Sequence, residues 1–132
     1  MIDKEIYRET EKRIMDDKVL IEQENVILQR KSENEENSYT CYLFKSGLDK
    51  ILKKVGEECT ETVIAAKNLG AGAGDVTELK KQLVGEVSDL LYHLQVMLCD
   101  VDVSITDVLS DIEERSHKTG NKKIMKKVDK NT

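Results

Sequence analysis

The sequence contains no proline and no tryptophan among its 132 residues. Proline breaks a helix interior because it lacks the backbone N–H and its ring clashes with the preceding turn. Its absence is therefore typical of a chain built from uninterrupted helices. At this length we expect one domain with one modest hydrophobic core, because most domains contain about 100–150 residues.

Cysteine is scarce: the three residues Cys41, Cys59 and Cys99 are widely spaced and form no CxxC pair. An odd number at such spacing indicates neither a disulfide framework nor a zinc site, so we expect a reducing compartment. The opening residues, MIDKEIYRETEKR, contain no apolar segment of the kind found in signal peptides. We therefore expect a soluble, cytoplasmic protein.

Basic charge and long apolar runs are also lacking. The formal net charge is −5, whereas non-specific nucleic-acid binding requires a basic surface that neutralises phosphates. No run approaches the length of about 20 apolar residues that a membrane-spanning helix needs. We therefore expect neither nucleic acid nor a membrane as a partner. An anionic substrate would need a bound cation to offset the repulsion of this acidic chain.

Apolar residues recur at helical spacing in several segments, so we expect an all-α fold without strands. The expected helices cover residues 3–31, 38–46, 48–69 and 75–99, and a last helix starts at residue 104. Capping boxes open the last two helices, with Asp75 and Glu78 in the first and Ser104 and Asp107 in the second. The glycine-rich segment GAGAGD, residues 70–75, separates the two long helices.

The two ends of the chain lack a regular apolar pattern. Apolar residues are sparse before Val19, so we expect residues 1–18 to form a loosely packed extension. The segment that begins at His117 is rich in lysine, and we expect residues 117–132 to be a flexible tail. Residues 1–132 are thus expected to form a single domain with poorly ordered ends.

Acidic residues interrupt the apolar faces of the two long helices. On a helical wheel of about 100° per residue, Glu58 and Glu61 flank the apolar stripe of the first helix, whereas Glu57 points away from it. In the second helix, Glu86 falls inside the stripe and Asp89 lies beside it. A carboxylate on a buried face is costly unless it is paired or bound to a metal. An ExxE motif followed by a core-facing ExxD motif therefore points to a metal site.

The short glycine loop predicts that these two helices form an antiparallel hairpin with their acidic faces toward each other. The four acids then supply oxygen ligands, which Mg²⁺ prefers, and Mg²⁺ commonly also binds substrate phosphates. Lys50, Lys54, Glu61 and Asn68 share one strip of the first helix, within about 40°. This strip sets cationic and amide donors beside the acids, so the sequence predicts Mg²⁺-dependent phosphate chemistry.

With these motifs in place, the sequence resembles the phosphoribosyl-ATP pyrophosphohydrolase family, a branch of the all-α MazG-type nucleoside triphosphate pyrophosphohydrolases. The superfamily pattern of ExxE, a spacer and ExxD is matched by Glu58, Glu61, Glu86 and Asp89. The flanking segments SYTCYLFKSGLDKILKKVGEECTETVIAAKN and ELKKQLVGEVSDLLYHLQVML resemble the histidine-pathway branch nearly throughout. DVLSDIEER resembles its closing helix. The resemblance covers residues 20–116, which is most of the chain.

The resemblance implies a MazG-like helical bundle, completed by dimerisation, that acts in the second step of histidine biosynthesis. The implied reaction is hydrolysis of phosphoribosyl-ATP to phosphoribosyl-AMP and pyrophosphate, by Mg²⁺-activated attack of water on the α-phosphorus. The implied metal ligands are Glu58, Glu61, Glu86 and Asp89, and the implied catalytic acids are Glu57, Glu58 and Glu61. The implied substrate-binding residues are Lys50, Lys54, Lys67 and Asn68. Which carboxylate acts as the general base stays open.

Three alternatives share parts of this pattern. A MazG-type enzyme that removes ordinary or damaged nucleoside triphosphates needs the same four acids with a different pocket. A di-iron protein needs a Glu-x-x-His motif on each of two helices. Here Asp89 occupies the fourth position of the motif, and His93, which we interpret as an interior histidine, lies four residues further on. A non-catalytic helical protein would leave the acids merely solvated.

Overall fold

The computed structural model describes residues 4–119, except for the side chains of residues 6–17 and 119. Over this range the chain forms five helices and no strand, so the prediction of an all-α fold is confirmed. The helices are α1 (Lys4–Ser32), α2 (Tyr39–Ser46), α3 (Leu48–Gly70), α4 (Val76–Asp100) and α5 (Ile105–Thr119). None of these helices combines the length and the apolar character that crossing a membrane requires.

Parts of the expected extension and tail lie outside the described residues. The backbone of residues 4–18 is helical and belongs to α1, but its expected loose packing concerns side chains that are mostly outside the described set. At the other end, α5 continues through Thr119, past the expected start of the tail at His117. Residues 120–132 lie outside the described range.

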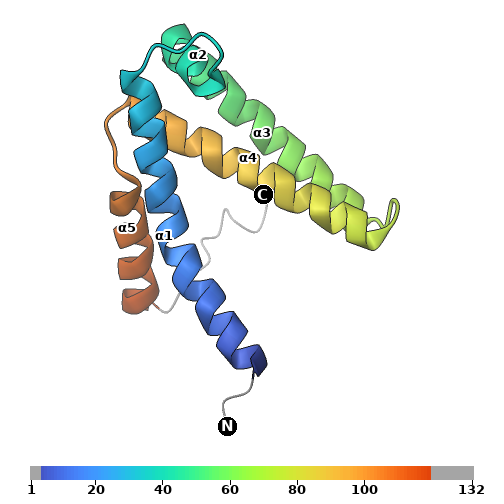
Figure 1. The fold of residues 1–132 in the computed structure, drawn as a ribbon. Helices are drawn as coiled ribbons and strands as arrows, with labels where there is room; N and C mark the ends of the chain where they lie inside the picture. Colours follow the sequence, from blue (N-terminus) through green and yellow to red (C-terminus); the bar gives the residue numbers. More distant parts are fainter. Residues whose placement is uncertain (1–3, 120–132) are drawn as a thin grey trace, which may run out of the picture.

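Helices α3 and α4 form the predicted antiparallel hairpin (Figure 1). Gly72 in the connecting turn has φ +64°, a backbone conformation that glycine adopts without steric cost. Asp75 caps α4 as predicted, because its Oδ2 accepts a hydrogen bond from the backbone N of Glu78 at 3.1 Å. Helix α1 crosses α4 and runs beside α5, and α2 lies at the end of the hairpin opposite the glycine turn (Figure 1).

The hydrophobic core lies where α1, α2, α3 and α4 meet. Its fully enclosed members are Ile27, Leu43, Ile51, Val96 and Cys99, each at most 2% exposed. Phe44, Tyr92 and Met97 pack against this cluster. The core therefore holds the α2 end of the hairpin, whereas in the described part of the chain the end near the glycine turn is supported mainly by contacts between α3 and α4.

Hydrogen bonds from two side chains, Gln95 and Lys31, join α1 to α4 beside this core. The Gln95 side chain is 1% exposed, and its Nε2 donates to the backbone oxygen of Leu20 at 2.7 Å while its Oε1 accepts from Gln23. Lys31 donates from Nζ to the backbone oxygen of Cys99 at 2.8 Å. Because a buried amide is costly unless its hydrogen bonds are made, these contacts define how α1 lies across α4.

The start of α5 is capped from a distant helix as well as locally. Ser104 Oγ accepts from the backbone N of Thr106 at 3.2 Å, which agrees with its predicted capping role. The backbone N of Ile105, however, donates to the carboxylate of Glu24 in α1, and Ser104 Oγ donates to the same carboxylate at 3.1 Å. Glu24 is 8% exposed, so an acid that looks unremarkable in the sequence holds α5 against α1.

We expect Glu24→Ala to lower the free energy of unfolding by about 1–3 kcal/mol, because the buried Ile105 N–H and the Ser104 hydroxyl lose their acceptor. Glu24→Gln keeps one carbonyl oxygen and should lose less. Urea denaturation followed by circular dichroism measures both changes. The matched control is Glu22→Ala on the exposed side of the same helix, expected to stay within about 0.5 kcal/mol of the parent. Equal stabilities of the two alanine variants would contradict the capping role.

Candidate active site

The acidic face of α3 meets that of α4 in the middle of the hairpin. Thr62 holds the two helices in register there, because its Oγ1 donates to the backbone oxygen of Glu58 at 2.7 Å and lies 3.4 Å from that of Glu86. Thr62 was not singled out from the sequence. Its position four residues after Glu58, on the same helix face, was the signal that would have identified it.

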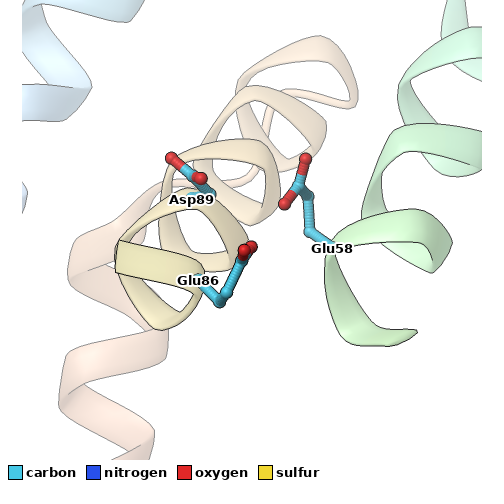
Figure 2. Close-up of side chains that lie close together, drawn as sticks. All are labelled: Glu58, Glu86 and Asp89. Carbon is cyan, nitrogen blue, oxygen red and sulfur yellow. The ribbon is translucent and has the colours of Figure 1, made fainter. Parts of the chain in front are cut away.

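Three carboxylates converge at this point (Figure 2). Glu58 extends from α3 toward α4, where Glu86 and Asp89 lie one turn apart. One oxygen from each of the three lies within 4.8 Å of the others. Glu58 is 6% exposed, Glu86 is half-buried and Asp89 is exposed, so the group runs from the helix interface to the surface. We call these three residues the carboxylate cluster.

The cluster is poorly compensated by the protein itself. Glu58 Oε2 and Glu86 Oε2 are buried, and neither has a hydrogen-bond partner. Burial raises the pKa of both carboxyls, and the nearby Glu61 carboxyl raises them further. Buried, like-charged oxygens of this kind are the donor set that a hard divalent cation takes up. The residues present therefore fit a divalent metal ion.

Glu57 and Glu61 lie near the carboxylate cluster but do not belong to it. Glu61 is exposed and lines the adjoining groove, close enough to influence the pKa of Glu58 and Glu86 but outside the tight group of three. Glu57 is exposed and pairs with Lys54 Nζ at 3.0 Å, which lowers its pKa. Lys54 also lies 3.5 Å from Glu58 Oε1, so it is the lysine that the fold brings to the cluster.

A groove of about 370 Å³ adjoins the cluster on the side of the glycine turn. Its lining residues are Glu61, Ile64, Ala65, Asn68, Gln82, Gly85, Glu86 and Asp89. Asn68 is thus beside the acids, whereas Lys50 and Lys67 do not line the groove. Gln82 was missed in the sequence, although it precedes Glu86 by four residues and therefore shares its helix face.

His93 is an interior residue, as interpreted from the sequence. It is 6% exposed, and both ring nitrogens are engaged, Nε2 with the Tyr39 hydroxyl at 2.7 Å and Nδ1 with the backbone oxygen of Asp89 at 2.7 Å. No nitrogen of His93 is left to bind a metal, and its side chain does not belong to the carboxylate cluster. This geometry counts against a di-iron site.

Comparisons with known proteins agree with the geometry. The sequence profile of the phosphoribosyl-ATP pyrophosphohydrolase family matches residues 20–116. The chain belongs to this family. It is 47% identical to the phosphoribosyl-ATP pyrophosphatase of Clostridium novyi over 105 residues, covering 80% of this chain and 87% of that protein. It is 46% identical to the phosphoribosyl-ATP pyrophosphatase of Listeria welshimeri over 103 residues, covering 78% and 90% of the two chains.

Some relatives of this chain are larger proteins, and the chain matches only part of their length. The histidine biosynthesis bifunctional protein of Halalkalibacterium halodurans is 52% identical over 92 residues, which cover 70% of this chain and 39% of that protein. The family match includes the hairpin and the whole carboxylate cluster. It starts at residue 20 within α1 and ends at residue 116 within α5.

The raised pKa values predict how the stability of the metal-free protein varies with pH. A carboxyl whose pKa is higher in the folded state binds protons more readily when folded. Its contribution is therefore most favourable near or below the ordinary value of 4.5, and it becomes unfavourable as pH rises through the raised pKa. Glu86→Gln removes this contribution, so its stability relative to the parent should increase between about pH 4.5 and about pH 8.

Urea denaturation in EDTA at the two pH values measures this difference. Glu114→Gln, an exposed acid on α5, is the matched control and should show no such pH dependence. A Glu86→Gln variant whose stability relative to the parent is the same at both pH values would show that Glu86 is solvated rather than strained.

Proposed function

We propose that this protein hydrolyses phosphoribosyl-ATP to phosphoribosyl-AMP and pyrophosphate in histidine biosynthesis, in the cytoplasm. The observation that carries the proposal is the carboxylate cluster, found in a chain that belongs to the phosphoribosyl-ATP pyrophosphohydrolase family. Relatives that share almost half of its residues are named phosphoribosyl-ATP pyrophosphatase. These names favour this reaction over a general house-cleaning activity on nucleoside triphosphates.

The cofactor in this proposal is Mg²⁺, held by Glu58, Glu86 and Asp89, with Glu61 as a fourth ligand from the groove. All four offer carboxylate oxygens, the ligand type that Mg²⁺ prefers. A bound cation supplies positive charge that offsets the phosphate oxygens and makes a nearby water more acidic. The two buried carboxylate oxygens without partners support this assignment, since a cation would compensate them.

In the reaction, water adds to the α-phosphorus, the bond from that phosphorus to the bridging oxygen breaks, and pyrophosphate leaves. A carboxylate must accept the proton of the attacking water, and Glu57, Glu58 and Glu61 are the candidates. Glu57 is the weakest of these, because Lys54 lowers its pKa and occupies its carboxylate. We propose that Glu58 or Glu61 accepts the proton, and that Glu57 orients Lys54.

Lys50, Lys54, Lys67 and Asn68 are the proposed contacts to the substrate. Lys54 has the strongest support, because its ammonium group lies 3.5 Å from Glu58 and can meet phosphate oxygens beside the cation. Asn68 is supported by its place in the groove wall. Lys50 and Lys67 stand on α3 outside the groove, so their role depends on how far the phosphoribosyl and phosphate groups extend.

The purified protein should release pyrophosphate from phosphoribosyl-ATP in Mg²⁺, and EDTA should abolish the release. Turnover of ATP and dCTP should be much weaker. Glu58→Gln and Asp89→Asn should each reduce kcat/KM by at least about a hundredfold while the helical circular dichroism spectrum is kept, because each removes a proposed metal ligand. A coupled assay for pyrophosphate measures all of these rates.

The control variant for this assay is Glu114→Gln, which removes one negative charge from an exposed position of α5 and should leave the rate unchanged. Turnover of dCTP in preference to phosphoribosyl-ATP would move the protein to the house-cleaning branch. Full activity in EDTA, or in Glu58→Gln, would contradict the proposed metal site.

We also propose that two copies of the chain form a homodimer through the hairpin. Large apolar side chains are exposed on both of its helices, and they lie away from the single-chain core: Val63 at 67%, Ile64 at 53%, Val76 at 53% and Val84 at 65%. Exposed apolar surface of this kind next to a site commonly marks an interface. A second hairpin would complete a bundle around the carboxylate cluster.

Light scattering after size exclusion should give a mass of twice the 15.0 kDa chain. Val84→Asp should shift the mass toward that of one chain, because a charge on the proposed interface would have to be desolvated. Ile112→Asp, a control at a comparably exposed apolar residue of α5, should leave the dimer intact. A Val84→Asp variant that stays dimeric would place the interface elsewhere.

A further inference from the structure

Tyr39, the first residue of α2, combines an anchored hydroxyl with an exposed ring. Its hydroxyl lies 2.7 Å from His93 Nε2, and the two rings meet edge to face with their centroids 5.7 Å apart. His93 is itself buried and is fixed by its bond to the backbone oxygen of Asp89. Tyr39 is nevertheless 47% exposed, so part of an oriented aromatic ring is open to solvent.

The hydrogen-bond directions limit what Tyr39 can offer to a ligand. A backbone carbonyl only accepts, so in the neutral ring of His93 the proton sits on Nδ1 and is donated to the Asp89 oxygen. Nε2 is then the acceptor, and the Tyr39 hydroxyl donates to it. The phenol proton is therefore committed inside the protein and is not available to phosphate oxygens. The feature left for recognition is the ring itself.

Tyr39 stands at the α2 end of the proposed active site. Burial raises the pKa of its phenol, the ammonium group of Lys54 opposes this, and the charges of Glu58 and Glu57 add to it. The same Lys54 lies 3.5 Å from Glu58 in the carboxylate cluster. Because α3 runs from Lys54 through Glu58 toward the glycine turn, Tyr39 lies on the opposite side of the cluster from the groove.

Few other aromatic residues of the described part are free to serve in this way. Phe44 and Tyr92 pack against the core, and the Tyr92 hydroxyl is hydrogen-bonded to Thr40. Tyr42 is 50% exposed and lies one turn along α2, but it has no tie to α4. Tyr39 alone among these is both exposed and coupled to the helix that carries Glu86 and Asp89.

We propose that Tyr39 is a base-binding residue whose ring stacks on the adenine of phosphoribosyl-ATP, and that His93 is a positioning residue that holds the ring. This inference rests on the proposed function. The acids and the cation that they would bind take the phosphates, which leaves an aromatic surface for adenine, the aromatic group of the substrate. Stacking between an aromatic side chain and a base needs no hydrogen-bond donor, which agrees with the committed phenol proton.

Steady-state kinetics of the Mg²⁺-loaded enzyme tests this assignment. Tyr39→Leu should raise the KM for phosphoribosyl-ATP by on the order of tenfold to a hundredfold, with little change in kcat. Tyr39→Phe keeps the ring but loses the bond to His93, so it should raise KM less than Tyr39→Leu does and should melt at a lower temperature than the parent. His93→Phe breaks the same bond and should give a similar intermediate KM, because the ring is kept but no longer held. The matched control Tyr42→Leu should leave KM unchanged.

Calorimetric binding of two probes separates the base from the phosphates without turnover. Tyr39→Leu should weaken binding of phosphoribosyl-AMP by the same factor as KM, and should leave binding of inorganic pyrophosphate, which has no base, unchanged. An unchanged affinity for phosphoribosyl-AMP, or an equal loss for both probes, would overturn the assignment. The assignment would also be overturned if Tyr39→Leu and Tyr39→Phe lowered the melting temperature equally and both kept the parental KM. That result would mean that the bond between Tyr39 and His93 only stabilises the fold. A parent protein that releases no pyrophosphate would contradict the proposed function, and the binding of phosphoribosyl-AMP would still decide the role of Tyr39.

Discussion

Two carboxylates, each with one buried oxygen, face each other across the α3–α4 hairpin, and the fold has to hold them there against their repulsion. Glu58 and Glu86 each keep one buried oxygen without a partner, and burial raises the pKa of both. Such an arrangement lowers the stability of the metal-free protein, since buried charge without compensation is costly. The hydrogen bond and close contact that Thr62 makes with the backbone oxygens of both residues keep the helices in register at this point.

The stability that offsets this strain comes from the far end of the hairpin. Ile27, Leu43, Ile51 and Val96 bring four helices together at the α2 end, and the buried side chain of Gln95 ties α1 to α4 there. Within residues 4–119 no third helix covers the glycine-turn end, and apolar residues such as Val63 and Val84 are exposed. Among the described residues, α2 and the end of α1 cover one end of the hairpin (Figure 1), and the carboxylate cluster lies between that packed end and the glycine turn.

The side chains on the two sides of the carboxylate cluster, toward α2 and toward the glycine turn, differ in chemical character. Toward α2 stand the ammonium group of Lys54 and the ring of Tyr39 held by His93. Toward the glycine turn the groove is lined by Asn68 and Gln82. A nucleotide is suited to such a site, because its phosphates, its base and its sugar phosphate require different partners.

The sequence by itself was sufficient to predict the five helices, the hairpin and a set of candidate acids that includes the carboxylate cluster. Apolar spacing, the Asp75 cap and the glycine-rich turn all act over a few residues, so local patterns were sufficient. Tertiary structure decided which of these acids form a tight group, with Glu61 outside it, and which lysine reaches the acids, Lys54 rather than Lys50 or Lys67. It also decided the contacts of Glu24 with Ile105, 81 residues apart, and of Tyr39 with His93, 54 residues apart. Such contacts depend on how whole helices pack against each other. The periodicity within one helix does not indicate which residues of another helix will lie beside it.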